Sequence, residues 1–149
     1  MGGKLLALVI AAVSGLTMAL QGTLNSALGK VVGLLEATFI VHIVGAVILA
    51  GMVFVFRMGT CDLAKWCSAP WYTYLGGVLS IVIVYAVAKS IPIVGVAVAT
   101  TAIVVSQIFT ASLIDHLGLF GLNRIPFTWH RVIGGFFMAG GAWLMLFRE

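Results

Sequence analysis

Hydrophobic residues fill five long stretches of the 149-residue chain, and polar residues gather mainly between them. A helix rises about 1.5 Å per residue, so roughly 20 apolar residues cross the hydrocarbon core of a bilayer. Each stretch approaches that length, so the pattern predicts an all-α integral membrane protein with a single five-helix domain over residues 1–149. The predicted transmembrane helices are Leu5–Leu28, Leu34–Phe56, Trp71–Ala88, Pro92–Asp115 and Arg131–Phe147.

Single residues mark the breaks between these spans. Lys89 interrupts the third stretch, and Pro92 suits the first turn of the next helix, where a backbone N–H is not needed. Gly118 follows the fourth stretch and is a natural helix stop. The first stretch is predicted to be a retained span and not a cleaved signal peptide, because further apolar stretches follow it.

The composition makes lipid the solvent for most of these helices. Hydrophobic residues make up 62% of the chain, charged residues make up 8%, and the mean hydropathy is +1.22. Ordinary soluble domains carry roughly 25% charged residues. The net charge is +4, but the basic residues fall singly between apolar runs. That distribution is typical of topology signals, and we expect no nucleic-acid partner.

Two cysteines, Cys61 and Cys67, lie in the polar loop of residues 57–70 without a CxxC spacing. No second ligand pair accompanies them, so we expect no metal site and no cofactor. Two alternatives remain open for the pair. They are unpaired thiols in a reducing compartment, or a loop disulfide if the loop faces an oxidising one.

The charge distribution predicts only a weak orientation in the membrane. Five spans place the termini on opposite sides, and the basic residues divide five to three, which favours a cytoplasmic N-terminus. A bias this small is also compatible with dual topology and with head-to-tail pairing of two copies, as in inverted-repeat transporters. The N-terminal side has Lys4, Arg57, Lys65, Arg124 and Arg131, and the other side has Lys30, Lys89 and Arg148.

A narrow polar stripe runs along the first span. Ser14, Thr17, Gln21 and Asn25 fall within about 80° of arc. Amide side chains in lipid must find partners or water. The stripe is therefore either a set of hydrogen bonds between helices or the lining of a substrate path.

The fourth span carries a matching stripe, in which Thr100, Gln107 and Asp115 share a similarly narrow arc. An acid in the last turn of a helix meets the negative end of the helix dipole, which is unfavourable. Asp115 is therefore predicted either to form an ion pair with Arg124 or Arg131 or to act in gating or coupling.

Depth along the helices suggests how the two stripes meet. With span centres near residues 16 and 104, Gln21 lies ~7.5 Å beyond the midplane, away from the N-terminal side, and Gln107 lies ~5 Å toward that side. Inverting one copy moves Gln107 to the level of Gln21. We therefore expect the two stripes to line one cavity across an antiparallel dimer.

Few titratable groups lie within the spans. His42 is near the middle of the second stretch, and a histidine gains or loses a proton near neutral pH. It is either a hydrogen-bonded structural residue or the coupling group of a transporter. Glu36 lies in the first turn of the same helix, where an acid is favourable, and is a weaker candidate for coupling or gating.

Small residues gather in the fifth span, in the segment GGFFMAGGAW at 134–143. Gly135 and Ala139 share one face, and Gly134 and Gly141 lie beside it, one heptad apart. Small residues let helix backbones approach closely in lipid. This set either packs within one chain or pairs two copies in a dimer.

Four segments together resemble the YdcZ family, which are small inner-membrane exporters of the drug/metabolite transporter superfamily. They are MALQGTLNSALG (18–29), IPIVGVAVATTAIVVSQ (91–107), VVSQIFTASLIDHLGLFG (104–121) and RVIGGFFMAGGAWLM (131–145). The resemblance covers nearly the whole chain and implies a five-helix protein of the bacterial inner membrane. It also implies one half of an inverted-repeat transporter, assembled as an antiparallel homodimer or with a sister chain. The shared pattern falls on Gln21, Asn25, Gln107 and Asp115.

The expected function is secondary export of a small polar metabolite by alternating access in a dimer. Small multidrug exporters carry a buried glutamate in their first helix, whereas the first span here holds no acid. Antiport of cationic drugs is therefore disfavoured, and amide-rich stripes suit a neutral or zwitterionic metabolite. A passive channel and a non-transporting assembly or signalling subunit are the alternatives. No catalytic constellation shares one depth, so we expect no enzyme.

Overall fold

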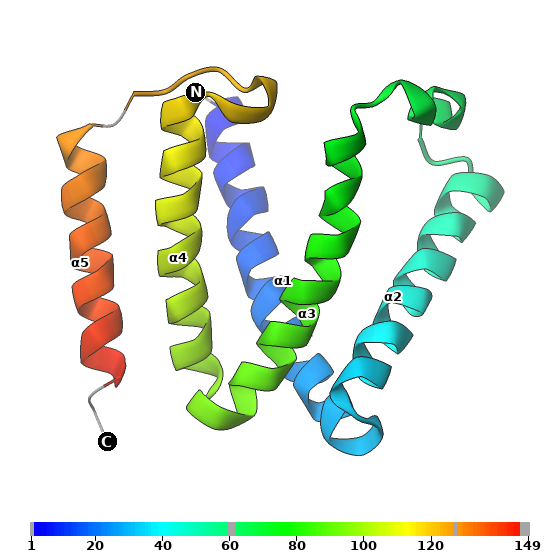
Figure 1. The fold of residues 1–149 in the computed structure, drawn as a ribbon, viewed down its shortest axis with the longest axis horizontal. Coiled ribbons are helices and arrows are strands. Elements are labelled where there is room, and N and C mark those ends of the chain that lie inside the picture. Colours follow the sequence, from blue (N-terminus) through cyan, green and yellow to red (C-terminus); the bar gives the residue numbers. More distant parts are fainter. Residues whose placement is uncertain (1, 60–61, 127, 147–149) are drawn as a thin grey trace. The chain divides into compact units, whose positions relative to one another are not determined.

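Helices make up most of the computed structural model, which describes residues 2–59, 62–126 and 128–146 (Figure 1). The prediction of an all-α protein is confirmed. Short helical turns are η1 (Gly51–Val55), η2 (Asp62–Ser68), η3 (Trp71–Tyr74) and η4 (Leu119–Gly121). The five α-helices are α1 (Gly2–Val32), α2 (Leu34–Ala50), α3 (Leu75–Val94), α4 (Val96–Leu117) and α5 (Trp129–Leu146).

Four helical segments are long enough and apolar enough to cross a membrane. They are Gly2–Val32, Leu34–Val55, Trp71–Val94 and Val96–Leu117. The apolar part of α5, Val132–Met145, is shorter. The fifth crossing therefore stays a prediction, and its predicted last residue, Phe147, lies outside the described residues.

Contacts along the chain divide it into two units, Met1–Ile93 and Val94–Glu149. The first unit holds α1, α2 and nearly all of α3, and the second holds α4 and α5. A single five-helix domain over residues 1–149 remains a prediction.

Glycines with positive φ set the two tightest helix junctions. Gly33 (φ 100°) separates α1 from α2, and Gly95 (φ 85°) separates α3 from α4. Only glycine adopts such backbone readily. The predicted break at Lys89 and Pro92 is wrong, because α3 continues through both residues and ends at Val94. A proline removes one helical hydrogen bond and bends a helix, but it does not have to end it.

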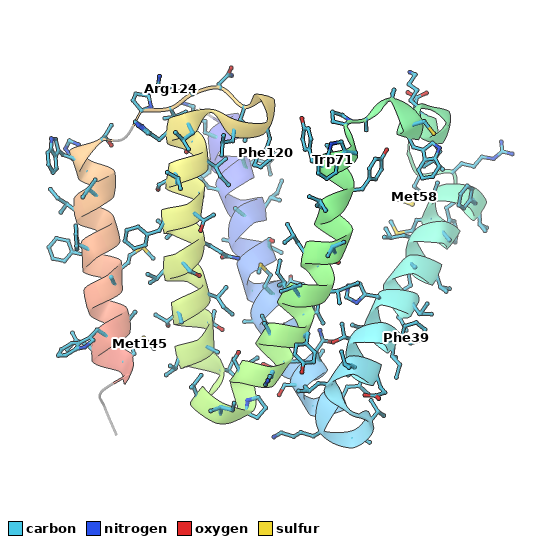
Figure 2. All side chains as sticks on the ribbon, in the orientation of Figure 1. Phe39, Met58, Trp71, Phe120, Arg124 and Met145 are labelled. Atoms are coloured by element: carbon cyan, nitrogen blue, oxygen red, sulfur yellow. The ribbon has the colours of Figure 1, made fainter. Side chains whose placement is uncertain are left out.

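The helices of the first unit pack at the end where α1 stops and α2 begins. Most of the buried residues there are small, which allows close approach of the backbones. Toward the opposite end, α2 and α3 lean apart, and the segment that carries η2 joins them near Met58 and Trp71 (Figures 1 and 2). The buried residues are Gly22, Asn25 and Ser26 of α1, Ala37 and Thr38 of α2, and Ala88 and Ile91 of α3.

A large side chain at Gly22 should separate α1 from α3. A Cβ there would lie 2.7 Å from Cγ1 of Val87 and 3.1 Å from Cδ1 of Ile91. We expect Gly22→Leu to destabilise the fold by about 1–3 kcal/mol through overpacking, measured as a lower thermal midpoint in detergent. Gly15→Leu is the control on the same helix, because a Cβ there meets nothing within 4 Å. Equal thermal midpoints for the two variants would contradict this packing.

Candidate functional site

The polar stripe of α1 is partly buried and partly exposed. Asn25 is 7% exposed and lies in the packed end of the first unit, whereas Ser14, Thr17 and Gln21 are exposed. The hydroxyl of Thr17 donates to the carbonyl O of Val13 in its own helix at 2.8 Å. The helix backbone therefore accounts for Thr17, whereas neither Asn25 nor Gln21 forms a side-chain hydrogen bond to another described residue.

The stripe of α4 shows the same contrast. Thr100 and Asp115 are half-buried, whereas Gln107, near the centre of α4, is exposed. Neither Gln21 nor Gln107 forms a side-chain hydrogen bond to another described residue. An amide that faces hydrocarbon without a partner costs several kcal/mol, on the order of 2–7. Both amides therefore need water, a ligand or a group from outside the described chain.

The observed helix bounds change the depths of Gln21 and Gln107 relative to the centres of their helices. The centre of α1 falls at about residue 17, and the centre of α4 falls between 106 and 107. Gln21 then lies ~6 Å past the centre of its helix, but Gln107 lies within ~1 Å of the centre of its own. Inverting one copy changes the level of Gln107 by only ~1.5 Å. Depth alone thus gives no support to an antiparallel arrangement.

A hydrogen-bonded histidine joins α2 to α3. Nδ1 of His42 lies 2.7 Å from the carbonyl O of Thr38, and Nε2 lies 3.1 Å from Oγ of Ser80. Ser80 also donates its hydroxyl hydrogen to the carbonyl O of Gly77 at 2.7 Å. Both side chains are half-buried. Sequence reasoning singled out His42 but missed Ser80, because one serine in an apolar helix produces no pattern.

Glu36 lies exposed in the first turn of α2. Its carboxylate folds back onto Gly33, where an added Cβ would collide with Oε2. An acid at this end of a helix interacts favourably with the dipole. This placement gives Glu36 a structural reason to be there, and a role in coupling or gating stays a prediction.

The end of α4 is closed by the turn that follows it. Gly118 is left-handed (φ 63°) and donates its N–H to the carbonyl O of Ile114 at 2.9 Å, which confirms the predicted helix stop. Arg124 donates from Nε to the carbonyl O of His116 at 2.9 Å, and its place beyond α4 is seen in Figure 2. A cation at this end of a helix is stabilising.

Asp115 belongs to the same closed helix end. Its backbone carbonyl accepts the N–H of Ile125 at 2.8 Å. Arg124 donates to the carbonyl of the next residue, His116, and the predicted ion pair between Asp115 and Arg124 stays a prediction. The predicted ion pair with Arg131 lies outside the described side chains.

Asp115 lines a cavity of about 440 Å³ in the second unit, and this cavity is open to the surface. Residues of α4 and α5 form this cavity together. They are Ile108, Ala111, Ser112 and Asp115 of α4 and Gly134, Gly135 and Met138 of α5. Gly135 is buried, and a Cβ there would lie 3.4 Å from Cζ of Phe109.

A second groove, of about 650 Å³, is lined by α5 alone. Gly140 and Gly141 line it together with Phe136, Phe137 and Trp143. The small residues predicted in this helix are therefore divided between two places. Gly134 and Gly135 line the cavity against α4, Ala139 is half-buried, and Gly141 lies in the groove of α5.

Comparison with known proteins decides the family. The family model described as "Putative inner membrane exporter, YdcZ" matches residues 6–144. The chain belongs to this family. As a member of the YdcZ family it is a multi-pass protein of the inner membrane, and its long apolar helices fit a transporter. No curated protein and no solved structure matches the chain.

Removing the Arg124 guanidinium should loosen the end of α4. Arg124→Met removes the hydrogen bond to His116 and the favourable charge, worth about 1 kcal/mol at an exposed site. We expect about fivefold faster amide exchange at Gly118 and Ile125, measured by mass spectrometry. Arg57→Met is the control, because Arg57 is an exposed arginine of the first unit. Unchanged exchange at these amides in Arg124→Met would show that Arg124 does not close the helix.

Proposed function

We propose that this protein is a secondary exporter of a small polar metabolite that works by alternating access in a dimer. The observation that supports this proposal is the exposure of Gln21 and Gln107, two amides within membrane spans and without a hydrogen-bonding partner among the described residues. Protein folding alone gives no reason to place such groups in lipid. A polar ligand or water in a translocation path gives that reason.

The chemistry of these side chains indicates the class of substrate. An amide both donates and accepts hydrogen bonds and carries no charge. Exposed hydroxyl groups of Ser14 and Thr17 lie on the same helix as Gln21, and Thr100 lies on the same helix as Gln107. Since α1 contains no acid, a neutral or zwitterionic metabolite suits this set better than an organic cation.

A second copy of the chain is proposed as the partner that completes the path. Much of the apolar surface of the described helices is exposed, and the groove of α5 is lined by two glycines and three aromatic residues. Close helix packing in lipid uses small residues in this way. An antiparallel homodimer would form a two-half transporter from one gene, and a sister chain of opposite orientation would serve equally well.

The amides should be needed for export and not for folding. In medium from expressing cells, mass spectrometry should show a polar metabolite above the level of cells without the protein. We expect Gln21→Leu and Gln107→Leu each to reduce its export about tenfold, since one lost hydrogen bond of about 1.4 kcal/mol has that effect.

Thr23→Val is the matched control for these variants. Thr23 is exposed on α1, and its hydroxyl bonds to the carbonyl O of Ala19 in the same helix. Normal export by both glutamine variants would exclude the proposed path. A change in thermal stability without a change in export would favour a non-transporting subunit, and flux without saturation would favour a channel.

Labelling from outside the cell tests the antiparallel arrangement. Single cysteines are placed at Gly2 and, separately, at Val31, near the two ends of the span α1, in a background without Cys61 and Cys67. An antiparallel homodimer requires both orientations, so we expect both sites to react with an impermeant maleimide in intact cells. Reaction at one site only would mean one fixed orientation and would exclude the antiparallel homodimer.

A further inference from the structure

We propose that His42 and Ser80 form a proton-binding site between α2 and α3, in which proton uptake holds the two helices together. This inference rests on the proposed export function and deepens it, because it names the proton as the coupling ion. It also adds Ser80 as a positioning residue that sequence reasoning did not find. The site consists of two side chains and two backbone carbonyls.

The three hydrogen bonds at the site require three hydrogens. The carbonyl oxygens of Thr38 and Gly77 only accept, so Nδ1 of His42 donates to the first and the hydroxyl of Ser80 donates to the second. Oγ of Ser80 then offers only lone pairs to Nε2, which must donate as well. An imidazole with hydrogens on both nitrogens is a cation. The observed arrangement is therefore fully satisfied only when the ring carries the bound proton.

A neutral ring leaves two hydrogens for the same three contacts. The carbonyl of Thr38, at 2.7 Å, can only accept, so the remaining ring hydrogen stays on Nδ1. Ser80 then either turns its hydroxyl hydrogen from Gly77 to Nε2 or leaves the ring. In both cases the link between α2 and α3 loses its charge-assisted hydrogen bond, and a charge-assisted bond is about twice as strong as a neutral one.

The site lies deep in the membrane. His42 is within ~4 Å of the centre of the span Leu34–Val55, and Ser80 is equally close to the centre of Trp71–Val94. A cation at this depth is costly unless protein groups or water surround it. Two acceptors, the Thr38 carbonyl and the Ser80 hydroxyl, are held against the ring.

The surrounding charges do not neutralise the ring. Among the described residues, no charged or titratable side chain of α1, α2 or α3 forms a hydrogen bond or ion pair with His42. Glu36 is six residues away along α2, or ~9 Å, and Lys89 is ~13 Å beyond Ser80 along α3. The charged or titratable side chains of these helices, apart from His42, are Lys4, Lys30, Glu36, Tyr85 and Lys89. Hydrogen bonds, and no counter-ion, therefore hold the proton.

The hydrogen bond between His42 and Ser80 lies where proton binding can change the separation of α2 and α3. Beyond His42 and Ser80, α2 and α3 lean apart toward the segment that joins them (Figure 1). Proton uptake favours the state in which the helices are held together, and proton release favours the state in which they separate. Such a change at one side of a span is what alternating access requires.

Nitrogen-15 NMR of labelled histidine, on the full chain in lipid vesicles, tests the hydrogen-bond assignment. Spectra are taken at about pH 4.5 and about pH 8.5, two units on either side of the ordinary histidine value of about 6.5. His42 is assigned by difference from His42→Gln. We expect two protonated nitrogens at low pH and the Nδ1–H tautomer at high pH. A neutral ring with its hydrogen on Nε2, or a ring that stays neutral at the lower pH, would overturn the proposal.

Spin-label distance measurements test the link between the helices. Labels are placed at Leu49 and Val78, which are exposed on α2 and α3, in a background without Cys61 and Cys67. We expect a shift to longer distances at the higher pH in the parent protein, and loss of that shift in Ser80→Ala. Ser80→Thr keeps the hydroxyl and should restore the shift. An equal pH response in the parent and in Ser80→Ala would overturn the link. It would show that the hydroxyl of Ser80 takes no part in the pH-dependent change of distance.

These outcomes separate the two proposals. The predicted tautomer and pH response in a protein whose glutamine variants do not alter export would remove the proposed function and leave the proton site. Export that depends on both glutamines, together with an Nε2–H tautomer of His42, would remove the proton site and leave the proposed function.

Discussion

The structure depends on one requirement, that polar groups in lipid must be satisfied by the protein itself. Hydroxyl side chains meet it locally, since each can donate to a carbonyl three or four residues earlier in its own helix. Amides are too long and have too many hydrogen-bonding groups to be satisfied in this way, and Gln21 and Gln107 are exposed amides for which the requirement is not met within the described chain. The hydroxyl groups bonded to their own helices in this way are those of Thr17, Thr23, Thr38, Ser80, Ser90, Thr101, Ser106 and Thr110.

How much could be predicted from the sequence follows from the range of each interaction. Spans and stops depend on composition and on local backbone preference, so four long apolar helices and the stop at Gly118 were predictable. The junction at Gly95 was missed because Pro92 is the more conspicuous residue, although α3 continues through Pro92 and the chain leaves helical geometry at Gly95, which has positive φ. The observed boundaries differ from the predicted ones by a few residues. This difference places Gln107 at the centre of its helix, so its depth no longer favours an inverted partner.

The candidate site was harder to predict, because its bonds join residues far apart in the chain. His42 and Ser80 are separated by 38 positions, and Arg124 reaches a carbonyl eight residues earlier. No periodicity in the sequence records such pairs. What the sequence did provide was a short set of polar residues in apolar helices and a resemblance to the family whose model matches residues 6–144.

The packed end of the first unit has a mechanical consequence. Its small buried residues form a pivot, and the contact of His42 with Ser80 acts on α2 about two fifths of the way along the arm that leads from that pivot to Val55. His42 is ~12 Å from Leu34, and Val55 is ~31 Å from it. A displacement at His42 is therefore amplified roughly 2.5-fold at the far end of the arm. A change as small as the lengthening of one hydrogen bond becomes a movement comparable to the size of a water molecule.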